Sequence, residues 1–468
     1  MILNQFIYKK FSIYSIIKMA LVKSLNYASN KPISASGKPE ILRFRSDNST
    51  YNSGDVIRIE IPTGRQGQHL FPQDSYIEAK VSVQWTNGTT ATNVYLDGCA
   101  YSFFRRLRVL HGSNVIEDTL YSNRLWNAIY DVQRNASERR GDSINMLIYP
   151  PLYDSATNLG TFGLYGYGIP TTVTAGTYNS DARDFTFILP SALLGCLAQK
   201  SLPLSLCGAS SIYLELELES PTQVFYGATA GGNGVTAIKS FTLSDIYYNA
   251  KVVQLPYDIE KLVIESTDGI INLPCTAYKG ELKTIPSYQS SFNDKFSFQH
   301  SSVKNFLFFM QNSVTANGAA GSLSITQRPR MNLTEWNLMI NGEAYPSQPI
   351  NTLSKMYTEL MRSYDMLTDA KAGGILEYNL YNAPNAGNVG DQAEGDVLAT
   401  IVFKRFVAGL DLDRFNHSSD TLMSGLNCVG NTISLNLLLS TLGNANLYAF
   451  IQYDLNIKLQ GGLLQALY

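Results

Sequence analysis

The chain is dominated by apolar and polar side chains that alternate with a period of two. The pattern is clearest in three stretches, 55–62, 76–85 and 212–219, where Val, Ile, Leu or Ala recurs at every second position between charged or polar residues. This spacing is typical of strands that have one buried and one solvent-facing side. The sequence therefore predicts half-buried antiparallel strands as its main elements.

Only two stretches have the apolar spacing of an amphipathic helix, 119–133 and 351–367. Their expected buried faces carry Leu120, Leu125, Trp126 and Ile129 in the first, and Leu353, Met356, Leu360 and Tyr364 in the second. Each stretch follows a strand that ends in a glycine turn, marked by Gly112 and Gly342 about 230 residues apart. The same order of strand, turn and helix thus occurs twice.

The repetition continues downstream of each helix. Strand, loop and strand at 185–190 and 212–219 are echoed at 399–406 and 432–440, and each half closes on an aromatic strand. We interpret this as a structural duplication with a boundary at 255–264; two unrelated β domains that share one helix each are the alternative. A sandwich of about eight strands with one inserted helix is typical of a jelly roll.

The predicted fold class is accordingly all-β: two tandem eight-stranded antiparallel jelly rolls, each with one short inserted helix and long loops. The expected division is an N-terminal extension at 1–38, a first jelly roll at 39–255 and a second at 256–468. Long polar loops are predicted at 86–98, 154–183, 220–239, 312–322 and 383–396. Such loops would gather at the ends of the sandwiches as towers or contacts between subunits.

Composition favours a protein that meets copies of itself. Charged residues make up 16% of the 468, below the roughly 25% of typical soluble domains, so much of the surface is uncharged but polar. The 29 Tyr and 21 Phe suit subunit interfaces and suit β-sheet cores equally well. The net charge of −2 gives no electrostatic footprint for nucleic acid, so no sequence-specific nucleic-acid partner is expected.

Motifs of catalysis are missing from the sequence. The four histidines, His69, His111, His300 and His417, lie in no zinc or nucleophile motif, and no phosphate-binding loop occurs. The five cysteines are widely spaced and predicted to be buried thiols. No enzyme activity, cofactor or metal is therefore expected.

One acidic cluster, formed by Asp411, Asp413, Asn416 and Asp420, offers oxygen ligands at short spacing. The calcium-binding EF-hand pattern requires Gly and Glu where this loop has Asn416 and Leu422. A solvated loop that forms hydrogen bonds or salt bridges is the favoured interpretation.

The first eighteen residues combine aromatic and aliphatic side chains with lysines and no acid. Lys9 and Lys10 interrupt the apolar run far short of a membrane span. Two interpretations stay open: an amphipathic segment that lies on a membrane surface, or an extension that precedes a start at Met19. A secretory signal has little support, because the apolar run is short and no clear cleavage site follows it.

The duplicated arrangement, the strand Arg105–Val109 that leads into a helix, and the C-terminal run 406–460 resemble the double-jelly-roll major capsid proteins. This lineage includes adenoviruses, tailless membrane-containing phages, virophages and Polinton-like elements, and the resemblance covers roughly 39–468.

The resemblance implies a major capsid protein, located in the virion and made in the host cell, whose pseudo-hexagonal homotrimers tile an icosahedral shell. Expected partners are neighbouring capsomers, penton or minor capsid proteins and an internal lipid membrane. Phe6, Tyr8, Phe11 and Tyr14 would then face that membrane. The main competing function is a secreted or surface carbohydrate-binding β-sandwich protein, and a β-sandwich glycosidase comes third.

Overall fold

The structure is a computed structural model of the 468-residue chain. It describes residues 37–85, 92–96, 98–133, 186–190, 195–197, 201–208, 210–229, 238–312, 325–326, 328–364, 405–414, 424–439 and 444–467, with shorter pieces at 145, 152–153, 160–161, 168–169, 177–178 and 381.

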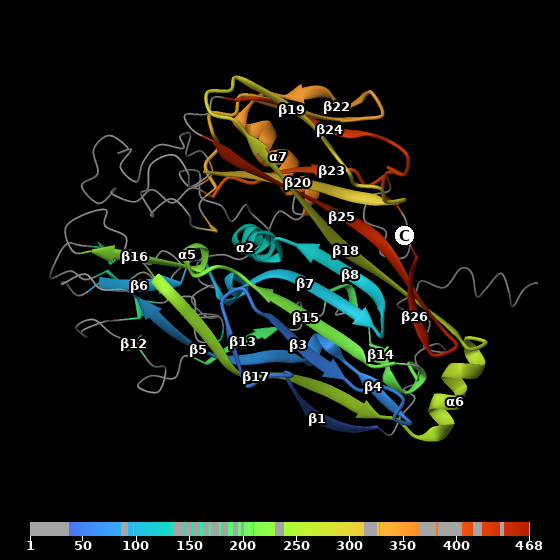
Figure 1. Cartoon of the computed structure of the whole chain (residues 1–468). Helices are drawn as coiled ribbons and strands as arrows, with labels where there is room; N and C mark the ends of the chain where they lie inside the picture. The colour runs from blue at the N-terminus through green and yellow to red at the C-terminus, as the bar shows by residue number, and fades with distance from the viewer. Residues whose placement is uncertain are drawn as a thin grey trace, which may run out of the picture.

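The first half of the described chain is built mainly from strands (Figure 1). They are β1 (Lys38–Arg45), β2 (Thr50–Asn52), β3 (Val56–Ile61), β4 (Gln68–Leu70), β5 (Tyr76–Trp85), β6 (Thr92–Leu96), β7 (Phe104–His111), β8 (Asn114–Leu120), β9 (Leu152–Tyr153), β10 (Gly160–Thr161), β11 (Gly168–Ile169), β12 (Thr177–Tyr178), β13 (Thr186–Pro190), β14 (Leu202–Pro203), β15 (Ile212–Leu218), β16 (Phe225–Thr229) and β17 (Ile238–Gln254). The helices are α2 (Ser122–Gln133) and α5 (Pro221–Val224), with short 3-10 turns at Pro72–Asp74, Ala100–Phe103 and Leu204–Leu206.

Helix α6 (Tyr257–Ser266) leads into the second half. Its strands are β18 (Ile270–Ile285), β19 (Ser291–Phe296), β20 (Val303–Asn312), β21 (Glu335–Ile340), β22 (Glu343–Ile350), β23 (Ala408–Asp411), β24 (Ile433–Leu438), β25 (Ala445–Gln460) and β26 (Leu463–Leu467), and its helix is α7 (Leu353–Ser363).

The two halves pair their strands in the same order. In the first, β1, β17, β5 and β13 lie side by side in one sheet and β3, β15, β7 and β8 in another; in the second, the equivalent orders are β18-β25-β20-β23 and β19-β24-β21-β22. All of these pairings are antiparallel. The predicted duplication is therefore confirmed at the level of strand pairing.

The inserted helices confirm it further. Helix α2 follows β8 and precedes β13, and α7 follows β22 and precedes β23, so both occupy the same connection. The hairpin turns that come before them contain Gly112 at φ +59° and Gly342 at φ +85°. Both turns need the left-handed backbone that glycine adopts without steric cost, which explains the sequence marker.

Two details of the sequence prediction are wrong. Helix α6 was not expected, because its apolar residues are spread around the helix and do not form one stripe. The loop regions 86–98 and 220–239 contain β6 and β16, and β6 pairs with β16 on one side and with β11 on the other in a small sheet. The strand expected at 399–406 lies mostly outside the described residues; the described strand that follows it is β23, which begins at residue 408.

Alternating side chains form the core of each half. Strand β15 buries every second residue from Ile212 to Leu218, as predicted. In the first half the ring of Phe103 stacks on Phe187, with 5.3 Å between centroids. In the second, Phe308 meets Trp336 edge to face at 5.0 Å. Each half thus has its own aromatic centre.

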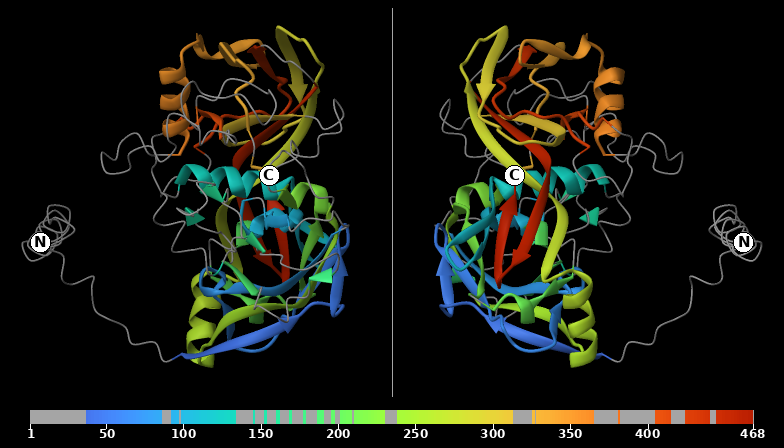
Figure 2. Two further views of the ribbon diagram at one scale, coloured as in Figure 1. Left: turned by 90° about the vertical axis from the view of Figure 1, so that its left-hand side faces the viewer. Right: turned by 90° about the vertical axis from the view of Figure 1, so that its right-hand side faces the viewer.

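The halves lie one above the other, with α2 at the level where they meet (Figures 1 and 2). The long strands β18 and β25 extend from the second half along the first toward α6. Residues far apart in sequence are therefore brought together at the surface between the halves.

Candidate functional site: a buried junction between two halves

Helix α2 is buried on nearly all sides, although its sequence is largely polar. Its buried residues include Ser122, Asn123, Arg124, Asn127 and Asp131 alongside four apolar ones. Burial of polar groups is costly unless each finds a partner. The helix therefore requires a network of hydrogen bonds, and the junction provides it.

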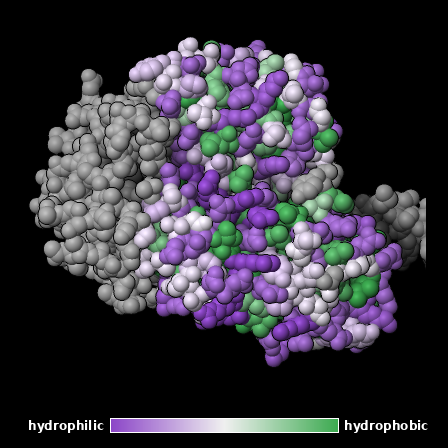
Figure 3. Space-filling model, viewed as in Figure 1, coloured by the Kyte–Doolittle hydropathy of each residue, from purple (hydrophilic) through white to green (hydrophobic). Residues whose placement is uncertain are grey.

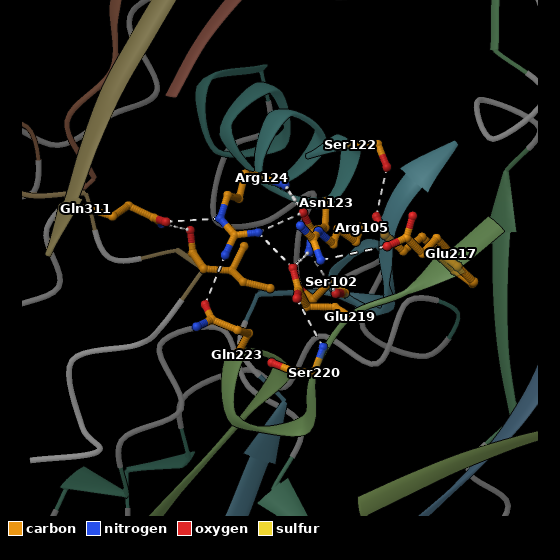
Figure 4. A network of polar contacts seen from close by, with 12 residues as sticks. Ser102, Arg105, Ser122, Asn123, Arg124, Glu217, Glu219, Ser220, Gln223 and Gln311 are labelled. Carbon is orange, nitrogen blue, oxygen red and sulfur yellow. Dashed lines mark hydrogen bonds and ion pairs between the residues drawn. The ribbon is translucent and has the colours of Figure 1, made fainter. Parts of the chain in front are cut away.

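Arg124 is the centre of that network (Figure 4). Its guanidinium donates to Glu219 at 2.8 Å and to Gln223 at 2.9 Å, both in the first half. It also donates to Gln311 at 3.1 Å and lies over the ring of Tyr448 at 4.8 Å, both in the second. One buried side chain thus contacts both halves.

The partners of Arg124 are held in turn. Asn123 donates to Glu219 at 3.0 Å, and the backbone N–H of Ser220 donates to the same carboxylate at 3.1 Å. Ionic contact with the arginine and these hydrogen bonds outweigh burial, so the pKa of Glu219 lies below its ordinary value. The pair is ionised and supported on several sides.

A second ionic contact crosses the junction at the other end of α2. Asp131 accepts from Arg328 at 2.5 Å and from Arg405 at 3.1 Å, and both arginines come from the second half. All three side chains are almost completely buried. Arg328 also lies over the ring of Phe309. Together with Arg124, this contact fixes both ends of the helix against the second half.

Strand β8 approaches the second half closely. The hydroxyl of Thr119 donates to the carbonyl of Tyr278 at 2.9 Å. A Cβ placed on Gly280 would lie 2.7 Å from the carbonyl oxygen of Leu120, so only glycine fits. His111 accepts at Nδ1 from the N–H of Leu464 at 3.1 Å. The junction is therefore a continuous interface and not a flexible linkage.

A buried carboxyl lies beside this contact. Glu117 accepts from the hydroxyl of Thr119 at 3.1 Å and from the backbone N–H of Cys196. Burial raises the pKa of Glu117 above its ordinary value, and these hydrogen bonds oppose the rise only in part.

The outward side of the sheet β3-β15-β7-β8 carries paired charges. Arg108 donates to Glu215 at 2.9 Å, and Arg106 forms two hydrogen bonds with Asp118, at 2.7 and 2.6 Å. Arg58 stacks on Tyr213 in the same sheet. These partly exposed charges neutralise one another, and their contribution to stability is small.

The chemistry considered from the sequence is not assembled in the described part of the chain. No group of three or more potential metal ligands lies together there. In the acidic cluster, Asp411 accepts from the N–H of Asp413 and Asp413 lies 3.8 Å from Lys304, while Asn416 and Asp420 lie outside the described residues. The partners found favour the loop interpretation over a calcium site.

Histidines and cysteines have structural surroundings. His300 stacks on Tyr453 at 3.9 Å, and burial lowers its pKa to about 4. Burial also lowers the pKa of His69 and of His111, and His417 lies outside the described residues. All five cysteines are free and buried, as predicted.

Phe6, Tyr8, Phe11 and Tyr14, predicted to face a membrane, lie outside the described residues. In the described part of the chain, no helix is both long enough and apolar enough to cross a membrane. The interface residues of α2 were missed at the sequence level, because polar residues on a helix normally mark its solvent-facing side.

No protein-family model and no curated protein matches the chain. Several solved structures are similar to it. A chain of the PBCV-1 virus capsid has a TM-score of 0.56 at 12% identity, covering 93% of this chain and 98% of that one. The Faustovirus major capsid protein has a TM-score of 0.56 at 10% identity, covering 94% of this chain and 93% of that one. The mavirus major capsid protein has a TM-score of 0.51 at 8% identity, covering 95% of this chain and 94% of that one.

The fold is a double jelly roll. The likeness spans nearly the whole chain, so it includes both halves and the arrangement of one against the other. The double jelly roll accounts for the equivalent connections that α2 and α7 occupy. Identities of 8–12% are too low to carry more than the fold.

Proposed function

We propose that this chain is a major capsid protein that assembles as pseudo-hexagonal homotrimers in an icosahedral virion shell. The observation that carries the proposal is the double jelly roll, which matches capsid chains over at least 93% of this sequence. Two like sandwiches in one chain give each trimer six similar blocks, a shape suited to tiling. In this proposal the protein is a structural component and not an enzyme.

The division of the chain follows from this proposal. We propose an N-terminal extension at 1–38, a first roll at 39–255 and a second roll at 256–468. The sheets support it, because the named strands up to Gln254 pair with one another and those from Ile270 onward do the same. A bonded junction would hold the two rolls as one block, so that a neighbouring copy meets a surface of fixed shape.

Partners beyond the chain itself are part of the same proposal. Neighbouring capsomers, penton or minor capsid proteins and synthesis in a host cell follow from a capsid role. The contact of Phe6, Tyr8, Phe11 and Tyr14 with an internal membrane stays a prediction.

Light scattering coupled to size exclusion tests the proposal on the purified full-length chain. A trimer should have a mass of about 155 kDa, three times the 51.8 kDa of one chain. Negative-stain images should show hexagonal outlines with a threefold axis. A stable monomer that forms no larger assembly at any concentration or salt would contradict the proposal, and retention of that monomer on a glycan column would favour the carbohydrate-binding alternative.

A further inference from the structure

Helix α6 buries a carboxylate and exposes its large apolar side chains. Glu260 is the one buried residue of the helix, and its carboxylate accepts from the N–H of Gly67 at 3.3 Å. Tyr257, Leu262 and Ile264 are 62%, 63% and 38% exposed. A ten-residue helix is marginal in water without packing. The exposed side of α6 therefore has the character of a contact surface.

Other exposed apolar side chains gather at the same end of the molecule. Val115 follows the turn between β7 and β8, and Leu463 begins β26, which packs beside β8. We call this region, α6 with the β7–β8 turn and the start of β26, the basal end; hydrophobic atoms are visible over α6 at the lower right of Figure 3. It carries five of the twelve exposed large hydrophobic residues of the described chain.

The N-terminal segment, residues 1–36, enters the described fold at this end. Lys38, the first residue of β1, pairs with Gln254, three residues before α6 begins. A Cβ on Gly37 would lie 2.8 Å from Val253 and 3.5 Å from Leu255, so the chain enters directly beside the helix. A short tether of this kind gives the segment a local concentration in the millimolar range at the basal end.

Charge favours the same contact. The N-terminal segment contains five lysines and no acidic residue. On α6, Lys261 is paired with Glu265 at 3.7 Å, which leaves Asp258 on the helix and Asp268 in the turn after it exposed at the surface. A basic segment with many aromatic and aliphatic side chains complements an acidic surface with exposed apolar ones.

We propose that residues 1–36 dock on the basal end of the same polypeptide, with apolar side chains of 6–17 packed against Tyr257 and Ile264. These two residues are seven apart and share one side of the helix. The lysines of the segment would lie near Asp258 and Asp268. An anionic lipid surface is a weaker candidate, because the same two carboxylates would repel it. The contact does not depend on shell assembly.

Photocrosslinking on the full-length chain tests this contact. Tyr257→p-benzoylphenylalanine places a reactive aromatic at an exposed position, so folding is preserved. Tyr288→p-benzoylphenylalanine is the matched control: Tyr288 is 80% exposed but follows β18, whose sixteen residues carry it about 50 Å from α6. We expect a crosslink from position 257 to residues 1–36, and none from position 288.

Mixing isotopically light and heavy chains separates a crosslink within one chain from a crosslink between copies. Replacing three lysines (Lys9→Glu, Lys10→Glu and Lys18→Glu) should reduce the yield at position 257 about fivefold, because attraction to Asp258 and Asp268 is lost. The proposal is overturned by a crosslink to another copy, by transfer of the crosslink to vesicles of equal parts phosphatidylcholine and phosphatidylglycerol, or by no crosslink to the segment.

Discussion

Replacing Arg124 by methionine removes the central side chain of the junction while keeping most of its apolar stem. Its partner Glu219 is buried beside it, with the two side chains only 5% and 7% exposed. Loss of one member of a buried ion pair costs about 3–5 kcal/mol. Asn123 and the Ser220 N–H still donate to Glu219, so we expect the lower end of that range, about 3 kcal/mol.

A double-mutant cycle isolates the contribution of the pair. In Arg124→Met/Glu219→Met no buried charge is left without its partner, so the double variant should be more stable than the sum of the single effects predicts, by about 2 kcal/mol. Lys80→Met is the control, because Lys80 and Asp245 form an ion pair of 3.1 Å that is about half exposed. It should cost less than about 1 kcal/mol.

Urea unfolding followed by tryptophan fluorescence and circular dichroism measures these free energies. Trp126 lies on α2 and meets Tyr278 across the junction, whereas Trp336 lies in the core of the second half. The chain also contains Trp85 at the end of β5, so variants that keep either Trp126 or Trp336 as the single tryptophan report separately on the junction and on one half. If Arg124→Met costs no more than Lys80→Met, or the double variant shows simple additivity, the junction does not depend on this pair.

Three further variants test one close contact and two buried titratable groups. Gly280→Ala places a Cβ against the opposite half and should lower the free energy of unfolding in urea by about 1–3 kcal/mol. Gly208→Ala is the control, because its Cβ would meet nothing within 4 Å and should have almost no effect. Equal effects of the two variants would contradict the close approach. Burial raises the pKa of Glu117 in the folded state above its ordinary value of 4.5. Ionisation of this carboxyl therefore lowers the free energy of unfolding as the pH rises above 4.5. Glu117→Gln should therefore be at least as stable as the parent at pH 7 and lose that advantage on acidification, and destabilisation at pH 7 would refute this. The pKa of His300 in the folded state is about 4, below its ordinary value of 6.5, so the protein loses stability as the pH falls from 6.5 to 4. In His300→Phe the melting temperature should therefore vary less with pH across that window. An unchanged pH profile would refute this.

The strands could be predicted because their pattern is local. In β15 every second side chain from Ile212 is buried, and the sequence alone shows that alternation. The hairpin turns at Gly112 and Gly342 were found for the same reason, since each requires a residue that tolerates positive φ. Local patterns of this kind also revealed the duplication, because both halves repeat them in the same order.

The junction could not be predicted, since its contacts join residues that are distant in sequence. Arg124 reaches Glu219 over 95 positions, and Asp131 reaches Arg405 over 274. One signal was available in hindsight. The polar residues of α2 are mostly Ser, Asn and Gln, with one Arg and one Asp, whereas α7 carries Lys, Glu and Arg as expected on a solvent-facing helix.

The two inserted helices show how position in the fold decides the role of a charge. Arg362 on α7 is 48% exposed and pairs with Glu359 one turn away, within its own helix. Arg124 on α2 is buried and joins both halves. Because the two helices occupy equivalent connections in similar sandwiches, the fold of a single half does not require one arginine to be buried and the other exposed. It arises because α2 lies between the halves. Substitution of Arg362 should therefore affect only local helix stability, whereas substitution of Arg124 should loosen one half from the other.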